Sequence, residues 1–399
     1  MTPSSADAVP GGDPRRAAAL VAAACVLQVA ESLIPHPVPG VRLGLANIIT
    51  LVTLAEGGLG AALEVALLRT VVASLALGSF LTPGFILSFC SAAASTLAMW
   101  LLWRFSSRFP AAGFGLPGIS VAGAAVHALV QLLLAYLLLV RHPGVFYFAP
   151  WLAVSAVVTG WLNAMVAAEV IRSAPGVLGG LPAAAACGPA ACPAPRSPLR
   201  GLPPAVKISG AAAILLLAVQ ASSLKGLLPA AAALLAAAVA ARLDGREYGR
   251  VLAGLRRVSW LALASFCLPV LFSAGGSVPF AEGLRSGALF AARLLLMGCA
   301  GLLLNVCASP EEIARGIAAL GRPLRRLGFK PDRAGAVIAM ALGSLPAFTE
   351  RARAAARAAL AGRGWRRGPV RWSVELAAGV INGMCGPSVG PRAYVSPAA

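Results

Sequence analysis

The sequence has very little charge for its length. Only 12% of its 399 residues are Asp, Glu, Lys or Arg, whereas soluble globular proteins carry about 25%. Apolar residues make up 59% of the chain, and the mean hydropathy is +0.82. So few polar side chains cannot cover a soluble core of this size. The shortage of charge excludes a single soluble domain and indicates a membrane protein.

The sequence also lacks the motifs that bind diphosphates, nucleotides and metals in many enzymes. It contains no paired-aspartate DDxxD run, no GxxxxGK[ST] nucleotide loop, and no HExxH or CxxC. The eight cysteines lie mostly in apolar segments, so they indicate neither a disulfide framework nor a metal site. We therefore predict a protein that is not an enzyme, has no catalytic residues, and binds no metal or cofactor itself.

The few charged residues are unevenly distributed. Residues 1–172 contain eight Arg, no Lys and six acidic residues, whereas the remainder contains 25 Lys or Arg and eight acidic residues. This difference predicts two modules. Excess Lys and Arg mark the cytoplasmic loops of membrane proteins. Aromatic residues do not alternate with the basic runs, as stacking on bases would require, so nucleic acid is not a predicted partner.

Apolar segments separated by Pro- and Gly-rich turns recur along the whole chain. They predict an all-α, polytopic integral membrane protein with about 11 transmembrane helices in two modules, plus cytoplasmic amphipathic helices. The second segment is short, and is tilted, re-entrant or joined to its neighbour. The segments are about 16–34, 43–56, 58–80, 84–104, 117–140, 146–171, 208–221, 226–242, 258–275, 286–307 and 373–385.

The first segment follows Arg15-Arg16, which predicts a cytoplasmic N-terminus in the cell inner (cytoplasmic) membrane. A cleaved signal peptide is the alternative, because Ala22-Ala23-Ala24-Cys25 resembles a lipoprotein cleavage site, but the apolar run continues to Ile34. The predicted parts of the chain are a tail (1–14), a six-helix membrane module (15–172), a Pro-, Ala- and Gly-rich linker (173–206) and a second membrane module (207–399).

A basic stretch in the second module has helical periodicity. Ser309, Pro310 and Glu312 predict a helix start, because Ser caps, Pro takes the first helical position, and Glu completes a capping box. Apolar residues then recur every three or four positions as far as Leu327. We predict amphipathic helices over about 309–328 and 346–364. They either lie on the anionic leaflet or dock a cytoplasmic partner.

Several polar side chains fall within the predicted spans of the first module. An ionisable side chain at the centre of a bilayer costs about 2.5–3.5 kcal/mol, so each is a candidate binding residue. Two interpretations are open: these side chains line a cavity for a small solute, or they join helices by hydrogen bonds. They are Gln28, Glu31, Asn47, Glu64, Arg69, His127, Gln131 and Asn163.

The run from Glu31 to Leu51 resembles the Gx transporter family, often labelled heptaprenyl diphosphate synthase component I. Leu67-Leu68-Arg69, the run Gly78–Pro83, and His127 with Gln131 fit the same pattern. The resemblance covers residues 15–172 and implies similarity to the substrate-binding S components of energy-coupling factor (ECF) transporters. With Arg42 added from the first run, the predicted substrate-binding residues are Glu31, Arg42, Asn47, Glu64, Arg69, His127 and Gln131.

The second module resembles the transmembrane T component of ECF transporters, of the cobalt-transporter permease type. The resemblance rests on residues 309–316, 322–328 and 345–350, and on the run to Ala361-Gly362-Arg363-Gly364. In that family, helices ending in Ala-Arg-Gly-like motifs insert into grooves on a pair of ABC-type ATPases. The resemblance implies that ATP-Mg is bound by such separate subunits, and that this chain contacts them through Glu350, Arg353, Arg357, Arg363 and Gly364.

The two resemblances predict a membrane subunit of an ECF-type ABC importer. It would bind a vitamin-, flavin- or quinone-precursor-like molecule and couple its uptake to the ATPases. Its predicted partners are those ATPases, the small-molecule substrate and the lipid bilayer. Two alternatives remain open: a membrane accessory subunit of prenyl diphosphate synthesis, and a non-transporting scaffold of a flavin or quinone electron-transfer system.

Overall fold

The protein is helical throughout the residues that the computed structural model describes, which are 13–32, 44–109, 114–173, 199, 201–274, 279–328, 330–361 and 369–385. These ranges contain no strand. The first module supplies α1 (Pro14–Ser32), α2 (Leu45–Ala76), α3 (Pro83–Arg108), α4 (Leu116–Leu134) and α5 (Ala149–Ser173), with the short turns η2 (Ala135–Val140) and η3 (Pro143–Phe148). The second supplies α6 (Pro204–Gln220), η5 (Lys225–Leu227), α7 (Leu228–Ala241), α8 (Gly245–Ala274), α9 (Phe280–Cys307), α10 (Pro310–Leu320), η6 (Arg322–Leu327), α11 (Pro331–Ala361) and α12 (Pro369–Cys385).

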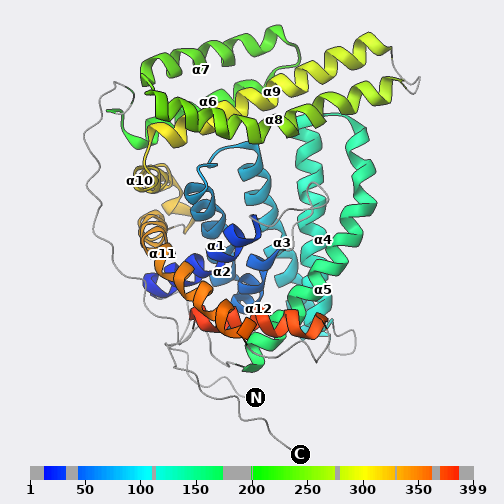
Figure 1. The fold of residues 1–399 in the computed structure, drawn as a ribbon, viewed down its shortest axis with the longest axis vertical. Helices are drawn as coiled ribbons and strands as arrows, with labels where there is room; N and C mark the ends of the chain where they lie inside the picture. The colour runs from blue at the N-terminus through cyan, green and yellow to red at the C-terminus, as the bar shows by residue number, and fades with distance from the viewer. Residues whose placement is uncertain are drawn as a thin grey trace, which may run out of the picture.

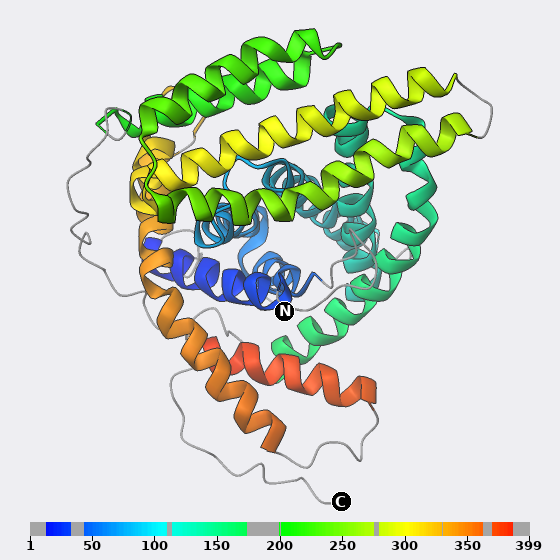
Figure 2. The same ribbon diagram turned by 45° about the horizontal axis from the view of Figure 1, so that its top comes forward.

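The two modules are in extensive contact and do not form separate bodies. Helices α8 and α9 run crosswise over one end of α4 and α5. Helix α11 runs down the side of the first module from α10, and α12 lies at the opposite end (Figures 1 and 2). Helix α11 packs against α1 and α2, and α12 packs against α5. Helix α1 therefore lies between α2 and α11, where its side chains from Ala17 to Leu27 are all buried.

Six of the helical segments in the described ranges are long and apolar enough to cross a membrane. They are α2, α3, α4 with η2, η3 with α5, α8 and α9. The prediction of an all-α, polytopic membrane protein is confirmed. Four predicted spans correspond to α1, α6, α7 and α12, which are shorter or less apolar than these six.

Large apolar side chains are exposed on the outer faces of both modules. Leu129 and Val154 of the first module are 60% and 63% exposed, and Trp260 and Leu271 of the second are 74% and 69% exposed. A water-soluble protein does not expose apolar surface so widely. These faces are therefore the ones that contact lipid.

Helix α2 is interrupted at Gly58, whose φ of 73° and ψ of −173° lie outside the helical region. The predicted segments 43–56 and 58–80 are the two parts of this element. Asn47 and Arg69 are hydrogen-bonded to each other, although 22 residues of straight helix would separate them by about 33 Å. The chain must therefore fold back sharply at Gly58, which brings both parts of α2 to one site.

The basic stretch of the second module differs from its predicted form. Helix α10 begins as predicted, with the Ser309 hydroxyl accepting a hydrogen bond from the Glu312 N–H at 3.2 Å. It ends at Leu320, and the short turn η6 follows, so the single predicted helix over 309–328 is wrong. The predicted start at residue 346 is also wrong, because α11 begins at Pro331 and contains Pro346.

Packing explains why Pro346 does not begin a new helix. Val337, Ile338 and Ala341 before it, and Phe348 after it, are all buried. A proline inside a helix removes one backbone hydrogen bond and costs about 3 kcal/mol. Burial of a continuous apolar face on both sides outweighs that cost. Most of the predicted linker, 173–206, lies outside the described residues, and α6 begins at Pro204.

The turn at Gly58 gives a first testable prediction. Gly58→Ala should destabilise the protein by about 1–2 kcal/mol, because a residue with Cβ is strained at positive φ. Gly60→Ala is the matched control. Neither added Cβ would meet an atom within 4 Å, but Gly60 is helical, so alanine should stabilise there by about 0.5–1 kcal/mol. SDS titration of the purified protein measures the free energy of unfolding of both variants. Equal stability changes for Gly58→Ala and Gly60→Ala would contradict the turn assigned at Gly58.

Candidate functional site

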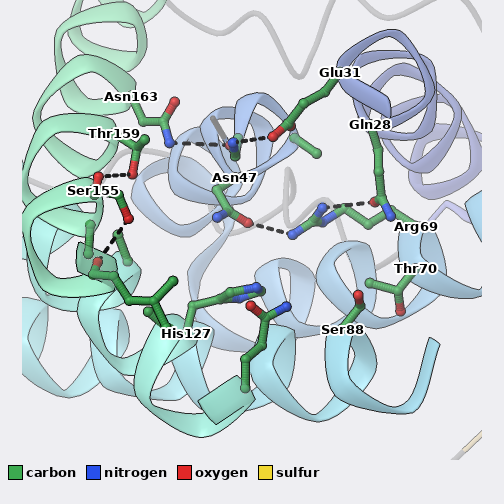
Figure 3. A pocket seen from close by; sticks show the side chains of 17 residues that line it. Gln28, Glu31, Asn47, Arg69, Thr70, Ser88, His127, Ser155, Thr159 and Asn163 are labelled. Atoms are coloured by element: carbon green, nitrogen blue, oxygen red, sulfur yellow. Dashed lines mark hydrogen bonds between the residues drawn. The ribbon is translucent and has the colours of Figure 1, made fainter. Parts of the chain in front are cut away.

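A polar cavity of about 80 Å³ lies among the five helices of the first module. Its lining includes amides, hydroxyls, one carboxylate, one guanidinium and one imidazole, which is unusual within helices that are otherwise apolar. Figure 3 shows these side chains converging from α1, α2, α3, α4 and α5. The lining residues are Gln28, Glu31, Gly44, Ala46, Asn47, Arg69, Thr70, Ser88, Ala124, His127, Ala128, Gln131, Leu152, Ser155, Ala156, Thr159 and Asn163.

Arg69 is the cation of the cavity, and its side chain joins α1 to both parts of α2. Its Nη1 donates to Gln28 Oε1 at 3.0 Å, and its Nη2 donates to Asn47 Oδ1. Arg69 is only 5% exposed. A buried guanidinium without hydrogen-bond acceptors would be strongly destabilising, so the two amide oxygens keep its charge at the cavity wall.

Glu31 caps the N-terminus of α2. Its carboxylate accepts hydrogen bonds from the Gly44 N–H at 2.7 Å and the Leu45 N–H at 3.1 Å. Negative charge is favoured at a helix N-terminus, where the first N–H groups have no partner in the helix. Gly44 has φ of 73°, and its carbonyl accepts from Asn163 Nδ2 at 3.2 Å. Glu31 and Asn163 thus hold the start of α2 against α1 and α5.

Helices α4 and α5 supply the opposite wall. His127 and Gln131 lie one turn apart on α4, and Ser155, Thr159 and Asn163 follow one another at intervals of four along α5. The Ser155 and Thr159 hydroxyls donate to carbonyls within α5, at 2.9 and 2.8 Å. Their oxygens still have acceptor capacity, so this wall presents both donors and acceptors to the cavity.

The structure brings together most of the predicted substrate-binding residues. Five line the cavity, whereas Arg42 lies outside the described residues and Glu64 points elsewhere. The five are Glu31, Asn47, Arg69, His127 and Gln131. The hydroxyl residues Thr70, Ser88, Ser155 and Thr159 were not predicted. Only the α5 residues carry a sequence signal, namely their spacing of four up to Asn163.

Glu64 joins the two modules instead of lining the cavity. Its carboxylate accepts from Arg333 Nε at 2.8 Å and from Arg333 Nη2 at 3.1 Å, and both side chains are about one-fifth exposed. Arg333 belongs to the first turn of α11. A bidentate arginine–carboxylate pair is a strong and geometrically specific contact. It fixes α2 to the helix that carries the predicted ATPase-contacting residues.

Three of the five predicted ATPase-contacting residues lie on the far half of α11. Glu350, Arg353 and Arg357 are all exposed there. Arg363 and Gly364 lie outside the described residues. The near half of the same helix packs against α1 and α2, which line the cavity. One continuous helix therefore extends from the wall of the first module to an exposed cationic surface.

The fold and cavity define an all-helical, multi-pass membrane protein with a polar cavity inside its first module. Residues 20–170 match the family described as heptaprenyl diphosphate synthase component I, and residues 195–382 match the family described as cobalt transport protein. The chain thus joins a segment similar to the first family to a segment similar to the second. Both resemblances predicted from the sequence are confirmed.

A curated relative supports the second match. Over 107 residues the chain is 32% identical to the energy-coupling factor transporter transmembrane protein EcfT of Thermanaerovibrio acidaminovorans. The match covers 25% of this chain and 40% of that protein, so it spans less than half of the relative's length. No solved structure matches the chain.

The cap on α2 gives a second prediction. Glu31→Gln should destabilise the protein by about 1–3 kcal/mol, because one amide oxygen replaces two carboxylate oxygens and leaves a buried N–H without its acceptor. Glu350→Gln, at an exposed position of α11, should change stability by less than about 0.5 kcal/mol. SDS titration measures the free energy of unfolding of the Glu31→Gln and Glu350→Gln proteins. A Glu31→Gln protein as stable as the control would show that the cap contributes little.

The ion pair between the modules gives a third prediction. Arg333→Glu should place two carboxylates in contact and lower the thermal unfolding midpoint, and Glu64→Arg should do the same with two guanidinium groups. The double variant Glu64→Arg/Arg333→Glu should recover most of the loss, with a coupling energy of about 1–3 kcal/mol. Strictly additive effects of the two substitutions would show that the pair does not tie the modules together.

Proposed function

We propose that this chain is a membrane subunit of an ECF-type ABC importer. The first module binds a small solute in its polar cavity, and the second receives motion from separate ATPase subunits that bind ATP-Mg. The observation that carries the proposal is the path from cavity to exposed cationic surface along α11. The two family matches within one chain support it.

The cavity favours a compact, polar substrate. Typical ligand pockets occupy about 300–1,000 Å³, so a cavity of about 80 Å³ accepts only a few non-hydrogen atoms unless it opens. One carboxylate and one guanidinium balance in charge, and four amides surround them. A small neutral or zwitterionic solute fits this lining better than an isoprenoid chain, which would leave the amides without partners. A flavin-sized molecule requires the helices to separate.

The crosswise packing of the modules supports a motion between them. Helices α8 and α9 run across α4 and α5 (Figure 1), and all four are candidate spans. In this arrangement, α8 and α9 cannot lie along the membrane normal at the same time as α4 and α5. In the proposed cycle the first module tips relative to the second, with its N-terminus on the cytoplasmic side of the inner membrane. Such a cycle imports solute only if the two states bind it with different affinity.

A pull-down with variants of α11 tests the proposal and gives the fourth prediction. The tagged chain, purified from native membranes in mild detergent, should retain a pair of ABC ATPases that mass spectrometry identifies. Arg353→Glu/Arg357→Glu should lose them, because the exposed cationic surface is reversed in charge. Arg363→Glu, in the motif identified from the sequence, should behave in the same way.

Arg246→Glu is the matched control, because Arg246 is an exposed arginine at the start of α8. It should retain the ATPases. A prenyl diphosphate synthase or an electron-transfer protein recovered in their place would contradict the proposal and favour one of the two alternatives. ATPases retained equally by all variants would show that α11 is not their contact.

A further inference from the structure

Two arginines meet at the junction of the modules without a carboxylate. Arg141 ends η2 in the first module, and Arg293 lies in the middle of α9 in the second. Arg141 donates to the Leu137 carbonyl at 3.2 Å and to the Val219 carbonyl at 2.8 Å, and Arg293 donates to the carbonyl of Ala221. Within the described ranges, neither forms an ion pair.

Arg293 has more unused hydrogen-bond donors than Arg141. It is 1% exposed, and its Nε and Nη1 have no hydrogen-bond partner. The guanidinium also lies 5.7 Å from the centre of the Phe290 ring. Contact with the C-terminal end of α6 offers about half a negative charge, which cannot balance two cations. A buried charged group with unused donors is strongly destabilising unless an anion or another acceptor completes its hydrogen bonds.

The backbone beside Arg141 is also irregular. Residues Ala135–Val140 form a π-helical turn that packs on α9, and Arg141 itself has φ of 46°. Both conformations are uncommon for ordinary residues, and such features cluster at functional sites. The π-helical turn and the positive φ set the position from which Arg141 reaches Val219 of the other module.

Aromatic side chains place this junction at the membrane interface. Tyr147 and Trp151 are 72% and 69% exposed, and Tyr147 and His142 both lie against Phe272, with ring centres 5.1 and 5.2 Å apart. Burial lowers the pKa of His142 below its ordinary value, which favours the neutral imidazole. Tyr and Trp are enriched at the depth of the lipid headgroups, which is where phosphate groups are concentrated.

We propose that Arg141 and Arg293 form a binding site for the phosphate of an anionic phospholipid, which joins the two modules at the membrane interface. The headgroup approaches from the side of Arg141, which is exposed, and its phosphate oxygens accept from the unused donors of Arg293. Arginine suits this role because its planar fork matches phosphate oxygens. Lys225, exposed four residues after Ala221, adds a third cation close by in the sequence.

Native mass spectrometry of the full chain in mild detergent tests the site. Phosphatidylglycerol added to the delipidated protein should be retained through collisional activation, whereas phosphatidylcholine, whose headgroup has no net charge, should be lost. Arg293→Met and Arg141→Met should each reduce retention of phosphatidylglycerol by about tenfold, the effect of removing one charge-assisted hydrogen bond. Arg285→Met, an exposed position of α9, is the matched control and should retain the lipid.

Three outcomes would overturn the proposal. The first is retention of phosphatidylglycerol by Arg141→Met equal to that of the wild-type protein. Because Arg141 is exposed, this substitution leaves the buried core unchanged, unlike Arg293→Met. The second is equal retention of phosphatidylcholine by the wild-type protein. The third is a thermal unfolding midpoint raised by inorganic phosphate but not by phosphatidylglycerol, which would assign the arginines to a soluble anion.

Discussion

Arg69 imposes the constraint on which the first module depends. A guanidinium at this burial has to be surrounded by acceptors, and two of them are amide oxygens on Gln28 in α1 and Asn47 in the first part of α2. Asn47 can reach Arg69 only because α2 folds back at Gly58. The fold-back leaves the start of α2 close to α1, where Glu31 caps it. The cavity is the space that remains among these polar contacts and the wall formed by α4 and α5.

The same part of α2 faces both the cavity and the second module. Glu64 and Arg69 are five residues apart, which places them about 140° apart around a helix. Arg69 therefore points to the cavity while Glu64 points to Arg333 on α11. One short helical segment therefore carries a contact to the cavity on one side and a contact to α11 on the other. This geometry provides direct mechanical contact between the two modules.

Composition and local signals predicted the class of fold and the members of the site, but not their tertiary partners. Low charge and long apolar runs predicted an all-α membrane protein, and Ser309 correctly marked the start of α10. The rule that ionisable groups within spans mark sites selected Glu31, Arg69 and His127, which line the cavity. It also included Glu64, because a partner 269 residues away has no local signal. Likewise, no local signal in the sequence indicated that α1 packs against α11.

Contacts between the modules differ in kind, and this difference bears on movement. Helices α1 and α11 share an apolar surface, whereas α9 meets the first module through a second apolar cluster, which includes Leu139 and Val145, together with polar and close backbone contacts. Asn305 donates to the Phe80 carbonyl at 2.9 Å, and a Cβ on Gly301 would lie 2.9 Å from the Thr82 nitrogen. Two separate subunits would need a large buried area to remain associated through such contacts. Two modules in one chain do not, because the covalent connection keeps their effective concentration high. The covalent connection therefore keeps the two modules together even when individual contacts between them break.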